Sequence, residues 1–148
     1  MSNTYSFLDV QATISGPGGV IPLGSGSGAA EEGITIRASE DLDTLTIGAD
    51  GQPMHSLHAS KGGMVIVRLL KTSPVNAALS AMVAFQRTSG ALFGQNLITI
   101  INPATGDGFT CRSCAFQKIP EINYRKEGGT IEWEFNVGIV DMALGPNL

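Results

Sequence analysis

Residues 63–90 join an apolar strand pattern to the one segment of this chain that has a helical pattern. Ser73 can cap a helix, and Pro74 suits its first position because the missing proline N–H would have no partner there. Apolar residues then recur at helical spacing, at Val75, Ala78, Leu79 and Met82. The pattern predicts a single helix over about residues 74–89 that lies flat on a sheet.

The rest of the chain alternates between apolar and polar residues as β-strands do. We expect strands over the following ranges: residues 4–15, 20–23, 33–37, 42–47, 64–70, 97–101, 109–116 and 131–139. Asp50 and Gly51 predict a tight turn, and the polar residues 52–62 predict a long exposed loop. One helix against many strands, without a linker or an internal repeat, predicts a mainly β fold in one domain of residues 1–148.

Three of these strands have side chains whose direction can be predicted. Leu45 and Ile47 are expected on the inner face of their strand. Residues 97–101 are apolar on both faces, which places that strand inside the sheet. In the last strand, Glu132 and Glu134 face away from the core, and the alternate residues face into it: Ile131, Trp133, Phe135, Val137 and Ile139.

The chain has few charged residues, 15% against roughly 25% in a typical soluble domain. Together with 19 glycines, this suggests a surface largely covered by copies of the chain or by partners, with an extracellular setting as the alternative. The net charge of −4 argues against a protein that grips nucleic acid by its phosphates. We see neither a secretory signal nor an apolar run long enough for a membrane span. Two cysteines make no disulfide framework, which indicates a reducing compartment during synthesis.

Charge is distributed unevenly along the chain. Acidic residues gather between residues 31 and 50, where only Arg37 is basic: Glu31, Glu32, Glu40, Asp41, Asp43 and Asp50. A solvated hairpin explains this cluster. An acidic surface that a polyanion passes, or that docks on a basic neighbour, explains it equally well. Residues 112–126 have the opposite bias, with Glu121 outnumbered by Arg112, Lys118, Arg125 and Lys126.

Two groups of residues offer candidate chemistry. Cys111 and Cys114, together with His55 and His58, supply four ligands of the kind a structural zinc site uses. Residues three apart on a strand point to opposite faces, however, so the better interpretation is that at least one of the two cysteines is buried and acts as a small hydrophobic residue.

The second group is Glu132 and Glu134, which lie about 7 Å apart along their strand, a separation that a glycosidase pair could use. A solvated sheet face explains them without catalysis. No serine or cysteine has a histidine in a fixed relation to it, so an enzyme is the weak alternative. We expect no catalytic, cofactor or metal site.

Many short segments of the chain are similar, in register, to one known family. They are residues 5–10, 12–19, 32–36, 47–51, 55–58, 67–76, 102–103, 105–106 and 133–135. With these segments the chain resembles the tail tube proteins of contractile-tailed bacteriophages, in a small myophage subfamily. The match extends over nearly the whole chain, although none of the segments is a catalytic signature.

The resemblance implies a β-sandwich or split β-barrel with one flanking helix. It also implies that six copies form a ring, that rings stack into a tube inside a contractile sheath, and that genomic DNA crosses this tube without specific binding. The expected partners are the chain itself, the sheath protein, and the tape-measure and baseplate proteins, with no cofactor. The expected location is the virion tail, assembled in the cytoplasm of the bacterial host.

Two sets of site residues follow as hypotheses. Acidic residues line the bore, either Glu132 and Glu134 or the hairpin residues Glu40, Asp41 and Asp43. The segment from Asp50 to Lys61 contacts the neighbouring ring, through Asp50, Gly51, His55, His58 and Lys61. Three other functions stay open: the tube of a phage-like bacteriocin or secretion system, a β-sandwich that binds the host, and a metalloprotein. The host-binding module is disfavoured because one Trp and two Tyr are few for an exposed aromatic patch.

Overall fold

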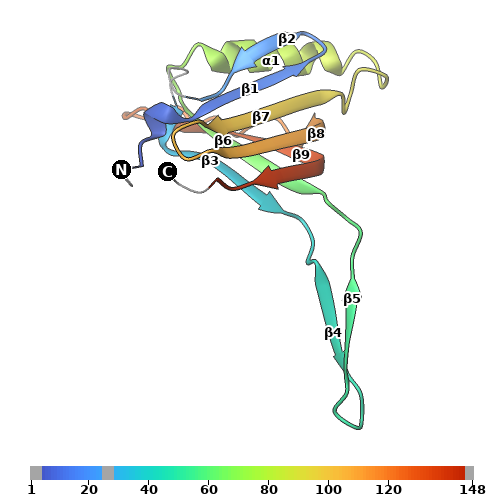
Figure 1. Ribbon diagram of the computed structural model, residues 1–148. Helices are drawn as coiled ribbons and strands as arrows, with labels where there is room; N and C mark the ends of the chain where they lie inside the picture. The colour runs from blue at the N-terminus through green and yellow to red at the C-terminus, as the bar shows by residue number, and fades with distance from the viewer. Residues whose placement is uncertain (1–4, 25–28, 146–148) are drawn as a thin grey trace.

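The computed structural model describes residues 5–24 and 29–145, which form one seven-stranded antiparallel sheet, one α-helix and a separate two-stranded hairpin (Figure 1). In chain order the elements are η1 (Phe7–Asp9), β1 (Gln11–Gly16), β2 (Gly19–Pro22), β3 (Ala29–Ala38), β4 (Asp43–Ile47), β5 (Pro53–Leu57), β6 (Gly63–Leu70), α1 (Val75–Gln86), β7 (Asn96–Asn102), β8 (Asp107–Phe116) and β9 (Thr130–Ala143). The order in the sheet is β2-β1-β7-β8-β9-β6-β3. The predicted mainly β fold with one flanking helix is confirmed. Within the described residues, no helix has the length and apolar character needed to cross a membrane.

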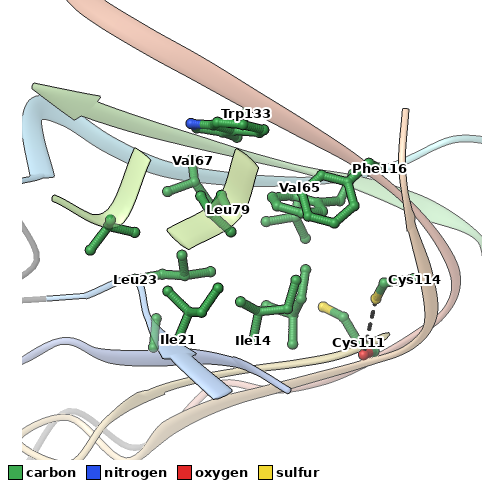
Figure 2. Packing of buried hydrophobic residues seen from close by; sticks show 14 of the residues in the cluster. Ile14, Ile21, Leu23, Val65, Val67, Leu79, Cys111, Cys114, Phe116 and Trp133 are labelled. Carbon is green, nitrogen blue, oxygen red and sulfur yellow. Dashed lines mark hydrogen bonds between the residues drawn. The ribbon is translucent and has the colours of Figure 1, made fainter. Parts of the chain in front are cut away.

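The sheet curls so that strands from its two ends share one core. Ile14 of β1 and Val65 of β6 are both fully buried in the same cluster, although three other strands, β7, β8 and β9, lie between β1 and β6 in the sheet. Figure 2 shows Ile14, with its neighbours from β1 and β2, opposite Val65 and Val67 of β6. Because the edge strands β2 and β3 pair only with β1 and β6 respectively, the curled sheet is an open, split barrel.

The helix packs on this core as predicted, except that Ala78 of the predicted apolar stripe is exposed. Its buried residues are Val75, Leu79, Met82, Val83 and Gln86. Ser73 Oγ accepts a hydrogen bond from the Val75 backbone N–H at 3.2 Å, which supports the start of the helix. The helix ends three residues before the predicted boundary, where Thr88 Oγ1 donates to the carbonyl of Phe85 at 2.6 Å.

The first predicted strand is shorter than expected. Phe7–Asp9 form the 3-10 helix η1, and the strand starts only at Gln11; Thr4 lies outside the described residues. Ser6 causes the difference, because its Oγ accepts a hydrogen bond from the backbone N–H of Leu8 at 3.2 Å and so caps the turn.

The segment between β3 and β6 differs most from the predictions. Pro53–Leu57, predicted as part of a loop, form β5 and pair with β4 into a hairpin that projects from the sheet (Figure 1). Leu45 and Ile47, predicted on an inner face, are 54% and 58% exposed. Among residues 5–24 and 29–145 no second layer packs on this hairpin, so neither face of its strands is an inner face. The predicted tight turn is confirmed, since the Gly51 N–H donates to the Gly48 carbonyl at 2.9 Å.

The interior strands follow the predicted pattern until a local irregularity. β7 lies between β1 and β8, as expected for a strand inside the sheet. In β9 the predicted core residues are buried as far as Val137, but Val140 packs on the core and Ile139 does not. The change of face occurs at Gly138, which lies opposite Ser113 of β8, and Ser113 has a positive φ of 54°.

Candidate functional site

Cys111 and Cys114 both point into the core, so the prediction that they face opposite sides of β8 is wrong (Figure 2). Their strand has one extra residue relative to β7, and the positive φ of Ser113 lies between them, which turns both thiols to one side. Cys114 Sγ donates to the carbonyl of Cys111 at 3.2 Å.

The environment of these thiols makes them poor nucleophiles. Burial, and then the charge of Asp141, raises the pKa of Cys111 to about 11. Burial, and then Cys111, raises the pKa of Cys114 to about 12. Because the thiolate is the reactive form, both side chains behave as small core residues, whereas the prediction was made for at least one of them.

The two histidines lie far from this core, on the exposed hairpin. His55 Nδ1 is 2.7 Å from Asp43 Oδ2, and His58 Nε2 is 2.6 Å from Thr44 Oγ1. The cysteine and histidine pairs are therefore not brought together, and the described residues contain no cluster of three or more His, Cys, Asp or Glu that could hold a metal. The geometry gives the zinc hypothesis no support.

Glu132 and Glu134 lie on the face of the sheet opposite the core, as predicted, and each carboxylate has its own cation. Arg68 Nε donates to Glu132 Oε1 at 3.3 Å, and Lys118 Nζ is 3.5 Å from Glu134 Oε2. Arg68 is held further by a 2.7 Å bond from Nη1 to Thr35 Oγ1. Around these two glutamates the open face is therefore polar but locally neutral.

A hollow of about 310 Å³ lies beside these glutamates, between β9 and the loop of residues 117–129. The charged residues that line it are equally divided in sign: Lys71, Lys118 and Arg125 against Glu121, Glu132 and Glu134. Lys71 Nζ donates to the Asn123 carbonyl and lies 3.9 Å from the centre of the Tyr124 ring. Such a balanced lining does not select a small anion or cation.

The hairpin of β4 and β5 is the strongest candidate surface. It exposes five large apolar residues: Leu42, Leu45, Ile47, Met54 and Leu57. A two-stranded hairpin without a core is marginally stable alone, and an exposed apolar patch marks an interaction site. The surface is also acidic, since residues 39–60 contain four carboxylates and no Lys or Arg.

The structure gathers most of the predicted site residues on this hairpin. Glu40 and Asp41 lie at its base, Asp43 lies in β4, Asp50 and Gly51 form its turn, and Lys61 lies where the chain returns to the sheet. Sequence reasoning missed the apolar residues of the hairpin as site residues. The signal that could have found them was the apolar pattern on both sides of the Asp50 turn.

Comparisons with known proteins give one family and a set of similar folds. A family model described as Bacteriophage PhiTE tail tube protein matches residues 1–145. No curated protein matches the chain. Among solved structures, a chain of the anti-feeding prophage cap, the AFP tube terminating cap, has a TM-score of 0.53 at 12% identity, covering 98% of this chain and 95% of that one.

Two further structures come from an extracellular contractile injection system. A chain of the PVC sheath-tube complex in its extended state has a TM-score of 0.51 at 11% identity, covering 90% of this chain and 88% of that one. A chain of the PVC sheath/tube terminator in its extended state has a TM-score of 0.50 at 14% identity, covering 90% and 93%. At these identities the likeness shows the fold.

Proposed function

Because the chain belongs to the Bacteriophage PhiTE tail tube protein family, we propose that its copies assemble into stacked six-membered rings that form the inner tube of a phage tail. It is a tail tube protein of a phage or of a phage-like contractile injection system. In the proposed particle a contractile sheath surrounds the tube, tape-measure and baseplate proteins start and limit it, and genomic DNA passes through the bore. The mature protein then resides in the virion tail after assembly in the host cytoplasm.

The observation that carries this proposal is the hairpin. Its strands are paired, yet every residue of β4 is exposed and no other part of the described chain covers the apolar side chains. An element of this kind is stabilised when another molecule covers it. The low content of charged residues is consistent with a subunit that is surrounded by its own copies.

We place the open face of the sheet toward the bore. On that face Glu132 neutralises Arg68 and Glu134 neutralises Lys118, so these two cations are not free to hold passing phosphates. Arg37 of β3 lies on the same face, where its Nη2 donates to Met64 Sδ at 3.3 Å. The glutamates therefore act by masking basic residues as well as by repelling DNA. The hairpin acids Glu40, Asp41 and Asp43 are the alternative lining.

Neutralising each set in assembled particles tests which lines the bore. Glu132→Gln with Glu134→Gln unmasks two cations, so DNA ejection slows if the open face lines the bore. Glu40→Gln with Asp41→Asn is the matched pair at the hairpin base. Slower ejection in only this second pair would move the bore to the hairpin, and unchanged kinetics in both would contradict an electrostatic role for either set.

Electron microscopy of the purified protein at high concentration, with light scattering in parallel, tests the tube itself. Hollow tubes or stacked rings are expected, either spontaneously or after addition of tail fragments as seeds. Monomers under both conditions would contradict the proposal. Similar folds from contractile injection systems favour a second candidate, a tube that carries cargo other than DNA. Nuclease-protected DNA in particles purified from infected or induced cells would distinguish a phage tail from that alternative.

A further inference from the structure

Two unusual surfaces lie at opposite ends of β6. At the first end of β6, Gly63 pairs with Ala38, the last residue of β3. The hairpin lies between these two residues in the chain, so both of its ends lie here. At the other end, the Lys71 N–H donates to the carbonyl of Gly129 at 3.0 Å, so the loop of residues 117–129 lies there. At about 3.3 Å per residue, the length of β6 separates the two surfaces by roughly 23 Å. We call residues 117–129 together with Lys71 the loop surface.

The two surfaces have opposite charge. The hairpin, residues 39–60, carries four carboxylates and no Lys or Arg. The loop surface has four cations against two carboxylates of its own, Lys71, Lys118, Arg125 and Lys126 against Glu121 and Glu127. Lys118 is paired with Glu134 of β9, so the excess of positive charge rests on Lys71, Arg125 and Lys126. Within the described residues, neither Asp50 at the hairpin tip nor Arg125 nor Lys126 forms an ion pair. These charges are therefore available to another molecule.

Both surfaces also expose apolar residues and lack internal support. The loop surface exposes Ile119, Ile122 and Tyr124, the last at 88%. Between residues 118 and 128 of the described chain, no backbone N–H donates to a backbone carbonyl. The hollow of about 310 Å³ opens at the same place. The loop surface thus presents backbone N–H groups without a backbone partner, apolar side chains and a depression to whatever covers it.

We propose that the hairpin of one copy docks on the loop surface of the copy stacked next to it along the tube. The contact joins different surfaces of two identical chains, so it repeats head to tail without closing and builds a stack. The inference rests on the proposed tube and adds to it the identity of the receiving surface. Charge attraction sets the direction of stacking, and the apolar residues of both surfaces are buried by it.

A charge exchange between copies tests this contact. Asp50→Lys alone places like charges together, as does Lys126→Glu alone. We expect each variant to raise the protein concentration needed for tubes at least about tenfold, which corresponds to about 1.4 kcal/mol. An equal mixture of the two variants should recover tube formation. Asp50 of the Lys126→Glu copies can then meet Lys126 of the Asp50→Lys copies, and the two introduced side chains, which have opposite charges, can meet each other. The difference in tube formation between each single variant and the unmodified protein should shrink as salt is added, because salt screens the repulsion between like charges.

Asp9→Lys is the control, since Asp9 is exposed on η1, has no ion pair within the described chain, and undergoes the same change of charge. Circular dichroism checks that each variant is folded. If Asp50→Lys acted only by damaging the turn within its own copy, adding copies with Lys126→Glu would not restore tube formation. Recovery in the mixture therefore indicates a contact between copies.

The possible outcomes separate the two proposals. If the unmodified protein forms no tubes even with seeds, the proposed function fails. If it forms tubes and the two variants do so equally well, or if both are impaired and their mixture is not restored, the tube stands and the docking contact is wrong.

Discussion

The strands β6 and β4 resemble each other in sequence but differ completely in burial. Both pair with antiparallel neighbours and contain Val, Ile, Leu or Thr at alternating positions. In β6 five of eight residues are buried, whereas in β4 all five are exposed. The difference is the second layer: β6 faces α1 and the strands from the other end of the curled sheet, and β4 faces only solvent in a single subunit.

This comparison shows that a strand pattern does not specify which molecule covers it. The apolar residues of β6 are covered by other parts of the same chain, so they stabilise the fold of each subunit. The apolar residues of β4 and β5 add little to that fold, and on our proposal they stabilise the assembly. Substitutions in the two regions should therefore separate subunit stability from tube formation.

The largest effect is expected for Phe135→Ala in the core. Phe135 is fully buried, and its ring centre lies 4.8 Å from that of Phe116. Removing a buried phenylalanine costs about 3–5 kcal/mol of unfolding free energy. Urea unfolding of the subunit measures the loss. Phe85→Ala, on the half-exposed side of α1, should cost much less, and equal losses would mean that burial does not govern stability here.

A smaller effect is expected at the one buried amide pair described in the structure. Gln86 Nε2 donates to Asn96 Oδ1 at 2.7 Å and to the Pro17 carbonyl at 2.9 Å, and Asn96 Nδ2 donates back to Gln86 Oε1 at 3.0 Å. The pair ties the end of α1 to β7 and to the β1–β2 turn. Gln86→Leu leaves the Asn96 amide buried without this partner, which costs about 1–3 kcal/mol.

The double substitution sharpens this prediction. With Asn96→Leu added, no amide of the pair remains unsatisfied, so the double variant should be destabilised by less than the sum of the two single variants in urea unfolding. Strict additivity would show that the two amides do not act as a pair.

Alkaline pH should weaken the core through its two thiols. In the unfolded chain they lose their protons near their ordinary pKa of 9.0, whereas in the folded chain burial raises the pKa values to about 11 and about 12. Above pH 9 the unfolded state binds fewer protons, so stability falls as pH rises, by up to about 1.4 kcal/mol per pH unit for each thiol. Below pH 9 this contribution is fully present.

Urea midpoints at a series of alkaline pH values measure the slope. Cys111→Ala with Cys114→Ala is the control, and its stability should fall less steeply over the same range. Parallel slopes for the two proteins would show that other groups cause the loss.

The alternation in β9 was sufficient to predict its buried residues up to Val137, because one strand face meets one core. The change of face at Gly138 could not be predicted, since it depends on the positive φ of Ser113 across the sheet. The same irregularity puts Cys111 and Cys114 on one side. A serine with positive φ has no distinct sequence signal, so this error arises from tertiary context.

The hairpin was only half predictable for a different reason. The turn at Asp50 and Gly51 has a clear sequence signal, and so does β4. Pro53 and the two histidines give β5 the composition of a loop, and only the pairing with β4 makes it a strand. The predicted contact segment, Asp50 to Lys61, thus contains the turn and β5 of this hairpin, and its contact with a neighbouring ring stays a prediction. The apolar residues of β4 were assigned to a core that the subunit does not provide.

The smallest effect on subunit stability is expected in this hairpin. Leu45→Ser and Leu57→Ser change residues that are 54% and 86% exposed, so each should alter the unfolding free energy by less than about 0.5 kcal/mol. Urea unfolding below the concentration of tube formation measures this, with Leu79→Ser in the buried face of α1 as the control that should be severely destabilised. The same hairpin variants should nevertheless form fewer tubes, because on our proposal these side chains become buried between copies. If Leu57→Ser destabilised the subunit as much as Leu79→Ser, the hairpin would have to pack against its own sheet in solution, and its apolar residues would no longer require a second molecule.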